Sequence, residues 1–438
     1  MPETSQACKI VIAQTPNGSD MVYCDQCGTR ADRDTKYCRI CGKKINHPSV
    51  LWRRKQNVVI GSIIMVMIVG ALFLGGYYPG SQVTWLHTCG TEICDEQNQP
   101  VKLYGPNFVG GDGKGLGLAD IQRIKALGFN TIRVMMPWGR LQPFGQGLNG
   151  TDVRYFTGID DFPLYHGLDE VMNWTIRERM YLILTVWWSA KEPPPAWAFP
   201  NITDNNQRNS ALILDGDASK ARTGLMNLWK FIANRYRNIP NLVLELLNEP
   251  FVMPTAPNYS VAGSAYKTFN EDIISSIESV ETRSHLKLVE PLIRGDLSEE
   301  IVDGAMDIDK TNVVWAFHYY APITDWDPNG SYWHESFTWH GQYYPAGWNN
   351  GTIYVTWRIT RVCDMIRAWK KPLMVTEFAK DTTQTYWKEW YQLVLSILSD
   401  YVPSGLILHQ YASDPQYEAG WNINNPTTQE KLMAIRFW

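Results

Sequence analysis

Residues 118–138 read LADIQRIKALGFNTIRVMMPW and contain a helix pattern followed by a strand pattern. Apolar residues recur from Leu118 to Leu127 at the spacing of one helical face, and Gly128 follows them as a stop signal. The apolar run after Gly128 has the length of a buried strand and ends in polar and aromatic residues. Such alternation of helix and strand is typical of α/β folds with a parallel sheet.

The same alternation continues through the C-terminal part of the chain. Short apolar runs begin near Val101, Asn130, Tyr181, Asn241, Leu286, Asn312, Pro372 and Gly405. Eight strand-helix units predict an α/β fold, a (β/α)8 TIM barrel over residues 101–438. An open, doubly wound sheet is the alternative, but no glycine-rich phosphate-binding motif follows the first strand. Residues 79–100 precede the barrel. They are expected to form a juxtamembrane segment, next to the transmembrane helix predicted below, and a hairpin that caps the barrel floor.

Four cysteines near the N-terminus have the spacing of a metal site. Cys24, Cys27, Cys38 and Cys41 form the pattern C-x2-C-x10-C-x2-C, which lets four thiolates converge on one zinc ion. Two disulfides in a small secreted module are the alternative. The pattern predicts a structural zinc ribbon over residues 21–45, after a flexible tail at 1–20 and before a basic linker at 46–57.

An uncharged apolar run separates this end from the barrel. Residues 58–76 contain no charge, and at about 1.5 Å per residue they span roughly 28 Å, close to the hydrocarbon thickness of a bilayer. We therefore expect a transmembrane helix at 58–78; a cleaved signal peptide is the alternative. Arg53, Arg54 and Lys55 precede the run, so the positive-inside rule predicts a single-pass cell-membrane protein with a cytoplasmic N-terminus and an extracellular barrel.

The amino-acid composition limits the kinds of molecule that are expected to bind the protein. With 40 basic and 44 acidic residues the formal charge is -4, which disfavours nucleic acid as a partner. Trp and Tyr, at 19 and 22 residues, exceed the 14 Phe residues, and aromatic surface with a polar group suits contact with sugars. Cys89 and Cys94 are expected to form a disulfide in an oxidising setting, whereas Cys363 lies on an apolar stripe and is expected in the core.

Polar residues that end the predicted strands identify the candidate site, because a barrel builds its active site at the carboxyl ends of its strands. They are Arg133 on strand two, Asn248 and Glu249 after strand four, His318 and Tyr320 after strand six, and Glu377 on strand seven. Two carboxylates at one mouth can protonate a leaving oxygen and attack an anomeric carbon, the minimum for acetal hydrolysis. Singly, each residue has an alternative as an ion-pair partner, a helix cap or a buried histidine.

These residues stand in blocks that resemble glycoside hydrolase family 5, the family of many cellulases and β-mannanases. The blocks are Gly-Phe-Asn-Thr-Ile-Arg, Leu-Asn-Glu-Pro, Phe-His-Tyr-Tyr and Val-Thr-Glu-Phe, in the family's order over residues 100–438. The resemblance implies that Glu249 is the acid/base and Glu377 the nucleophile. It also implies that Asn248 contacts the 2-hydroxyl, that His318 lines a subsite, and that Arg133 and Tyr320 orient the nucleophile.

Two positions depart from the family pattern. Strand three ends in Trp187 and Trp188, where the family's cellulases usually have a histidine. Strand eight ends in His409, Gln410 and Tyr411, where they usually have the tryptophan floor of the cleaved sugar. Either Trp421 in the next loop replaces that floor, or the pocket favours mannose over glucose.

Together these features predict a membrane-anchored, retaining glycoside hydrolase that cleaves β-linked polysaccharide, first of all an endo-β-1,4-glucanase (cellulase). Alternatives are a β-mannanase or other β-glycanase, a catalytically weak surface glycan-binding protein, and a transmembrane sensor. The expected partners are the glycan, membrane lipid and an unknown cytoplasmic partner of the zinc ribbon. No cofactor is expected for catalysis, and the combination of zinc ribbon and anchor suggests an archaeal cell surface.

Overall fold

The computed structural model divides into two compact units, Met1–Gly80 and Ser81–Trp438. It describes three short strands of the first unit. Of the second unit it describes residues 83–438 except 109–114, 148–150, 158–165, 215–219, 253–258, 293–306, 321–326, 329–336, 340–341, 345–350, 402–403, 417 and 435–438.

The first unit contains a small antiparallel sheet of β1 (Ile10–Gln14), β2 (Asp20–Cys24) and β3 (Arg30–Ala31). At residues 10–14 the structure differs from the predicted flexible tail over 1–20, because the apolar Ile-Val-Ile-Ala run of β1 pairs with β2 from Ile10 to Gln14. Residues 1–9 and 15–19 lie outside the described residues. Cys24 ends β2, while Cys27, Cys38 and Cys41 and the segment 58–78 lie outside the described residues. Among the helices that the structure describes, none has the length and apolarity needed to cross a membrane.

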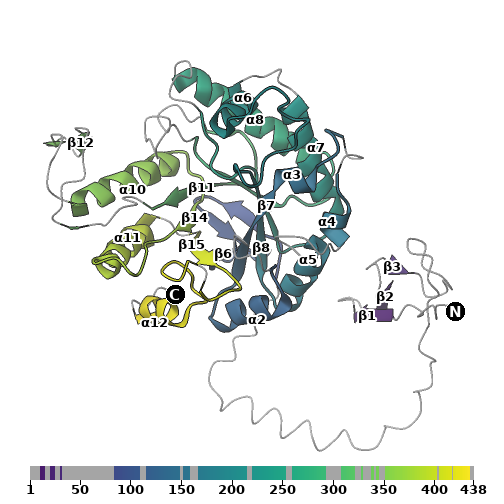
Figure 1. Ribbon diagram of the computed structural model, residues 1–438, viewed down its shortest axis with the longest axis horizontal. Helices are drawn as coiled ribbons and strands as arrows, with labels where there is room; N and C mark the ends of the chain where they lie inside the picture. Colours follow the sequence, from purple (N-terminus) through teal and green to yellow (C-terminus); the bar gives the residue numbers. More distant parts are fainter. Residues whose placement is uncertain are drawn as a thin grey trace, which may run out of the picture. The chain divides into compact units, whose positions relative to one another are not determined.

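The second unit is a closed barrel of eight parallel strands surrounded by helices (Figure 1). This confirms the predicted (β/α)8 barrel. The strands are β6 (Leu103–Phe108), β7 (Thr131–Pro137), β8 (Tyr181–Trp187), β9 (Leu242–Glu245), β10 (Leu286–Val289), β11 (Val313–Tyr319), β14 (Leu373–Phe378) and β15 (Gly405–Tyr411). Each begins within two residues of its predicted start.

The connections between these strands are largely helical. The main helices are α2 (Leu118–Ala126), α5 (Leu168–Arg177), α7 (Lys220–Arg235), α8 (Tyr259–Glu278), α10 (Gly351–Ala368), α11 (Trp387–Tyr401) and α12 (Pro426–Ala434). Shorter elements in the loops are α3 (Trp138–Leu141), α4 (Arg154–Thr157), α6 (Asn205–Leu214), β12 (Phe337–Trp339) and β13 (Gln342–Tyr344).

Helix α2 shows why sequence and structure agree here. Ile121 and Ile124 are fully buried against the barrel, and the helix ends where Gly128 adopts a φ of 92°, a left-handed conformation that glycine enters without steric cost. Strand β7, which follows, is buried along its whole length, as expected of a parallel strand with side chains packed on both faces.

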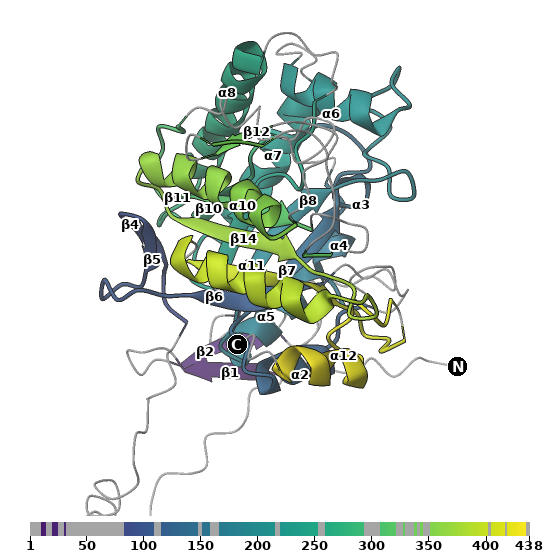
Figure 2. The same cartoon turned by 90° about the vertical axis from the view of Figure 1, so that its left-hand side faces the viewer.

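A hairpin of β4 (His87–Cys89) and β5 (Glu92–Cys94) precedes the barrel and carries the disulfide Cys89–Cys94. The Thr88 N–H donates to Asn312 Oδ1 (3.2 Å), and Asn312 directly precedes β11, so the hairpin lies at the amino ends of the strands. Figure 2 shows it at the left-hand end of the barrel. The predicted hairpin and disulfide are confirmed, and Cys363 is buried in α10 as expected.

Candidate active site

Polar side chains from most of the barrel strands, or from the residues directly after them, converge at the carboxyl end of the barrel. Strands β11 and β14 pair in parallel, and a register shift after Phe317 places His318 opposite Glu377. On the other side of the barrel, Asn107 on β6 lies opposite Arg133 on β7. The structure therefore brings the predicted site residues Arg133, His318 and Glu377 to one mouth, together with Asn107.

Arg133 is the centre of the site and is fully buried. Its guanidinium donates to the carboxylates of Glu245 and Glu377, to Asn107 Oδ1 (3.1 Å) and to Asn248 Oδ1 (2.8 Å). Burial by itself lowers the pKa of Arg133, but the charges of its carboxylate neighbours outweigh burial and raise it. A buried charge is tolerated when it is paired and hydrogen-bonded in this way.

Glu377 on β14 is buried and accepts hydrogen bonds from Arg133, from the Tyr320 hydroxyl and from Asn107 Nδ2 (3.0 Å). Burial alone raises the pKa of Glu377, yet the positive charges of His318 and Arg133 and the Tyr320 hydrogen bond lower it to about 2. The carboxyl group is therefore ionised at neutral pH, as an attacking carboxylate must be.

Glu249 follows β9 in a different environment. Its side chain is 47% exposed, and His318 Nδ1 lies 3.0 Å from its Oε1. One carboxylate oxygen of Glu249 lies within 4.8 Å of one of Glu377. The two carboxylates thus face a common space, one buried and ionised, the other open to solvent.

Asn248 and Tyr320 complete the first layer around this pair. The Asn248 backbone N–H donates to the Val186 carbonyl at the end of β8 (3.0 Å), which holds the loop after β9 against its neighbour. Burial, followed by the nearby charge of Glu377, raises the pKa of Tyr320 well above its usual range. Its hydroxyl therefore stays protonated and can only donate to Glu377.

The two tryptophans at the end of β8 lie in different surroundings. Trp188 packs on the core, with its ring centroid 5.5 Å from that of the fully buried Trp138. Trp187 is half-buried and is not among the side chains that pack on that core. Both indole N–H groups are buried without a hydrogen-bond partner among the described residues. Adjacent residues on a strand point to opposite sides, which accounts for this difference between Trp187 and Trp188.

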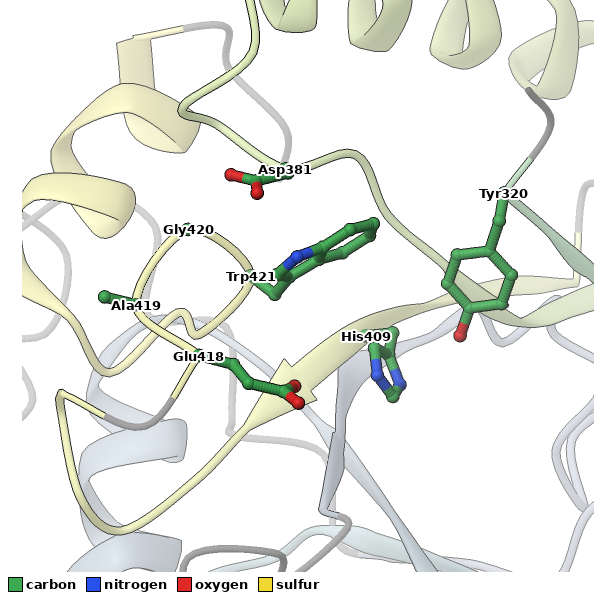
Figure 3. A pocket seen from close by; sticks show the side chains of 7 residues that line it. All are labelled: Tyr320, Asp381, His409, Glu418, Ala419, Gly420 and Trp421. Atoms are coloured by element: carbon green, nitrogen blue, oxygen red, sulfur yellow. The ribbon is translucent and has the colours of Figure 1, made fainter. Parts of the chain in front are cut away.

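A cavity of about 570 Å³ is lined by Tyr320, Asp381, His409, Glu418, Ala419, Gly420 and Trp421, and Tyr320 and His409 among them contact Glu377. The Trp421 ring reaches into it toward Tyr320, whose ring centroid is 6.4 Å away (Figure 3). Burial lowers the pKa of His409 despite the nearby Glu377 charge, so His409 is a neutral imidazole. An indole and several polar groups around a cavity of this size suit a sugar unit.

Three residues of the site were not anticipated from the sequence. Asn107 donates to Glu377, Glu245 accepts from Arg133, and Glu290 lies behind His318. The sequence contains a signal for two of these residues. Glu245 interrupts the apolar run of β9. Glu290 ends the apolar run of β10 and directly precedes a proline, as Glu249 does after β9. Asn107 is a small polar residue within a strand and gave no comparable signal.

Among the described residues, two groups of side chains bring three oxygen or nitrogen atoms within 4.8 Å of one another, as a metal site requires. One is Glu245, Glu290 and His318, and the other is Glu249, His318 and Glu377. Arg133 already supplies a positive charge to Glu245 and Glu377 and lies 3.6 Å from Glu290 Oε1. The guanidinium thus provides the counter-charge that a cation would provide there.

Several solved structures share this fold. The catalytic domain of the major endoglucanase from Xanthomonas campestris is 18% identical, with a TM-score of 0.55 over 80% of this chain and 99% of that chain. Cel5A from Thermotoga maritima, crystallised with cellobiose, is 14% identical, with a TM-score of 0.52 over 76% of this chain and 96% of that chain. At such identities the likeness concerns the fold.

At the level of sequence, the chain is 22% identical to Endoglucanase B of Clostridium cellulovorans over 213 residues. These are 47% of this chain and 42% of that protein, so the alignment spans less than half of either. The family Cellulase (glycosyl hydrolase family 5) matches residues 94–403, which include the barrel from β6 to α11 and end just before β15. The chain therefore belongs to glycosyl hydrolase family 5 and is a glycoside hydrolase.

Proposed function

We propose that the barrel is a retaining β-glycanase, in the first place an endo-β-1,4-glucanase, with Glu377 as nucleophile and Glu249 as acid/base. The observation that carries this is the approach of the Glu249 and Glu377 oxygens to within 4.8 Å. Retaining enzymes hold their carboxyl groups about 5 to 5.5 Å apart, whereas inverting enzymes need about 6.5 to 9.5 Å to admit a water molecule.

In the first step, Glu249 gives its proton to the glycosidic oxygen while Glu377 attacks the anomeric carbon and forms a glycosyl ester. The exposed position of Glu249 suits an acid that must meet the leaving group and, later, water. Tyr320 and Arg133 direct the Glu377 carboxylate, and Asn248, held by Arg133, is available to the sugar's 2-hydroxyl. In the second step Glu249 takes a proton from water, which releases the sugar with its configuration retained.

For the sugar itself we propose a glucose unit in the cavity beside Glu377, with Trp421 as its apolar floor. The position of Trp421 in that cavity supports its part in replacing the tryptophan missing from the end of β15. A mannan substrate is the second candidate, because His409 stands in place of that tryptophan. The Thermotoga Cel5A structures carry cellobiose in one case and mannotriose in another, with TM-scores of 0.52 and 0.50.

The test is hydrolysis by the full-length chain, assayed with soluble β-glucan, mannan and xylan for release of reducing ends, and with NMR of the first anomer formed. We expect glucan to be the best substrate and the product to have the retained configuration. Glu249→Ala should slow substrates with poor leaving groups far more than activated aryl glycosides, since the latter need little protonation. An inverted product would refute the mechanism, and glycan binding without hydrolysis would favour the binding-protein alternative.

We also propose that the enzyme is anchored in the cell membrane by the segment 58–78, with a zinc ribbon formed by Cys24, Cys27, Cys38 and Cys41 on the cytoplasmic side. The C-x2-C spacing and the uncharged run preceded by basic residues support this arrangement. The zinc would be structural, so a chelator should leave hydrolysis intact. Protease added to intact cells should remove the barrel and spare the N-terminus; the reverse pattern would contradict the proposed orientation.

A further inference from the structure

Glu290 is a buried carboxyl group to which the mechanism above assigns no role. It follows β10 and is 2% exposed, and its backbone carbonyl accepts from the Tyr266 hydroxyl of α8 (2.8 Å). One carboxyl oxygen, Oε2, accepts the backbone N–H of Glu249 (3.1 Å). The other, Oε1, lies 3.3 Å from His318 Nε2 and 3.6 Å from Arg133 Nη2.

The first contact acts on the backbone of the proposed acid/base. Glu249 has a φ of 47°, and a residue other than glycine stays in this left-handed region only where its surroundings hold it there. Glu290 supplies one of the bonds that hold it, at the amide of Glu249 itself. The direction in which the Glu249 side chain leaves the loop thus depends on Glu290.

The second contact acts on His318, which reaches the Glu249 carboxylate from the opposite ring nitrogen. Neither His318 Nε2 nor Glu290 Oε1 has a hydrogen-bond partner among the described residues, so the 3.3 Å contact between them is an ion pair and not a hydrogen bond. The charged or titratable groups around the imidazole come from every neighbouring strand: Arg133 on β7, Glu245 and Glu249 at β9, Glu290 at β10, Tyr320 after β11, Glu377 on β14 and His409 on β15.

Both members of this pair have displaced pKa values. Burial by itself lowers the pKa of His318, but the carboxylates of Glu290 and Glu377 outweigh burial and raise it to about 9. Burial raises the pKa of Glu290 well above its ordinary value, against the opposing charge of His318. Near neutral pH the pair therefore holds a proton, and His318 Nδ1 can donate to Glu249 Oε1 across 3.0 Å.

We infer that Glu290 is a positioning residue for the acid/base step: it fixes the Glu249 backbone through its N–H and keeps His318 as a donor to the Glu249 carboxylate. This inference rests on the proposed glycosidase function. When Glu249 passes its proton to the leaving oxygen, its new negative charge meets the N–H of His318, while His318 keeps its protons. In its ionised form Glu290 balances the charge of the imidazolium in the buried site.

The test compares the full-length enzyme with Glu290→Gln, which keeps the size and an acceptor oxygen but removes the charge. Two aryl β-cellobiosides are used, one with a good and one with a poor leaving group. We expect kcat for the poor leaving group to fall roughly 10-fold or more, and kcat for the good one to fall much less. We also expect the alkaline limb of the pH profile to move to lower pH by about one unit, because His318 loses a stabilising charge.

The ratio of the two rates does not depend on how much of the variant folds, since misfolding lowers both rates alike. Glu281→Gln is the matched control, because Glu281 is also buried and also contacts a histidine, His285 Nδ1 at 2.6 Å, but at the barrel floor. It should keep the wild-type ratio and pH limb. Equal falls for both substrates in Glu290→Gln, or the same change in Glu281→Gln, would overturn the inference. A wild-type enzyme that hydrolyses no glycan would instead refute the proposed function.

Discussion

Tyr320→Phe removes one of the hydrogen-bond donors that keep Glu377 ionised. The donors Arg133 and Asn107 stay in place. A hydrogen bond to a charged group contributes about 1.5 to 3 kcal/mol, and one pKa unit corresponds to about 1.4 kcal/mol. The loss should therefore raise the pKa of Glu377 by roughly one to two units. From about 2 it should reach roughly 3 to 4, which leaves the carboxyl group ionised at pH 6.

Hydrolysis needs Glu377 in its carboxylate form, so the activity falls as the pH drops through the pKa of Glu377. The acidic limb of kcat/KM should thus lie higher in Tyr320→Phe than in the wild type, by the same one to two units or so. The position of the acidic limb is measured from initial rates with an activated aryl glycoside. Samples that are held at each pH and then assayed at pH 6 show how much activity is lost to acid unfolding. An acidic limb that stays in place would show that the Tyr320 hydroxyl does not stabilise the ionised nucleophile.

Three further outcomes can be measured. The pKa of Glu377 is about 2 against an ordinary 4.5, and this lowering contributes up to roughly 3 kcal/mol to the free energy of unfolding. The contribution is present above pH 4.5 and is lost as the pH falls toward 2. In urea unfolding, the free energy of unfolding of Glu377→Gln should therefore fall less over that pH range than that of the wild type. Trp187→Ala should raise KM for oligosaccharides, whereas Trp188→Ala should mainly lower the melting temperature, because Trp188 packs on Trp138; equal effects on KM would contradict this division. Replacing Cys89 and Cys94 by serine should cost about 2 kcal/mol in the unfolding free energy, the chain-entropy value for so short a loop, without altering kcat.

The barrel could be predicted because each of its strands and helices has a recognisable pattern within its own stretch of sequence. A strand buried on both faces reads as an apolar run, and the helix after it reads as an apolar stripe with a stop, so each of the eight units was visible by itself. Glu249 and Glu377 were visible for the same reason, as polar residues at the ends of such runs.

What could not be predicted depends on which side chains meet across the barrel. The burial of Glu290 against His318 requires β10 and β11 to be neighbours with a particular register, and no spacing along the chain encodes that contact. The left-handed backbone of Glu249 is likewise set by the loop around it and not by its residue type. The strand at residues 10–14, within the predicted tail at 1–20, could not be predicted because its short apolar run becomes a strand only by pairing with β2.

Arg133 has a consequence for the order in which the domain folds. Its partners Glu245 and Glu377 lie 112 and 244 positions further along the chain, on β9 and on the next-to-last strand of the barrel. Contacts of such sequence separation form late, after the entropy of long loops has been lost. Until β14 docks, the guanidinium lacks Glu377, one of the two carboxylates that accept its hydrogen bonds, and an incompletely paired charge resists burial. Recovery of hydrolysis during refolding should therefore report docking of β14, and a fragment that ends before β14 would lack the nucleophile and one of the carboxylate partners of Arg133.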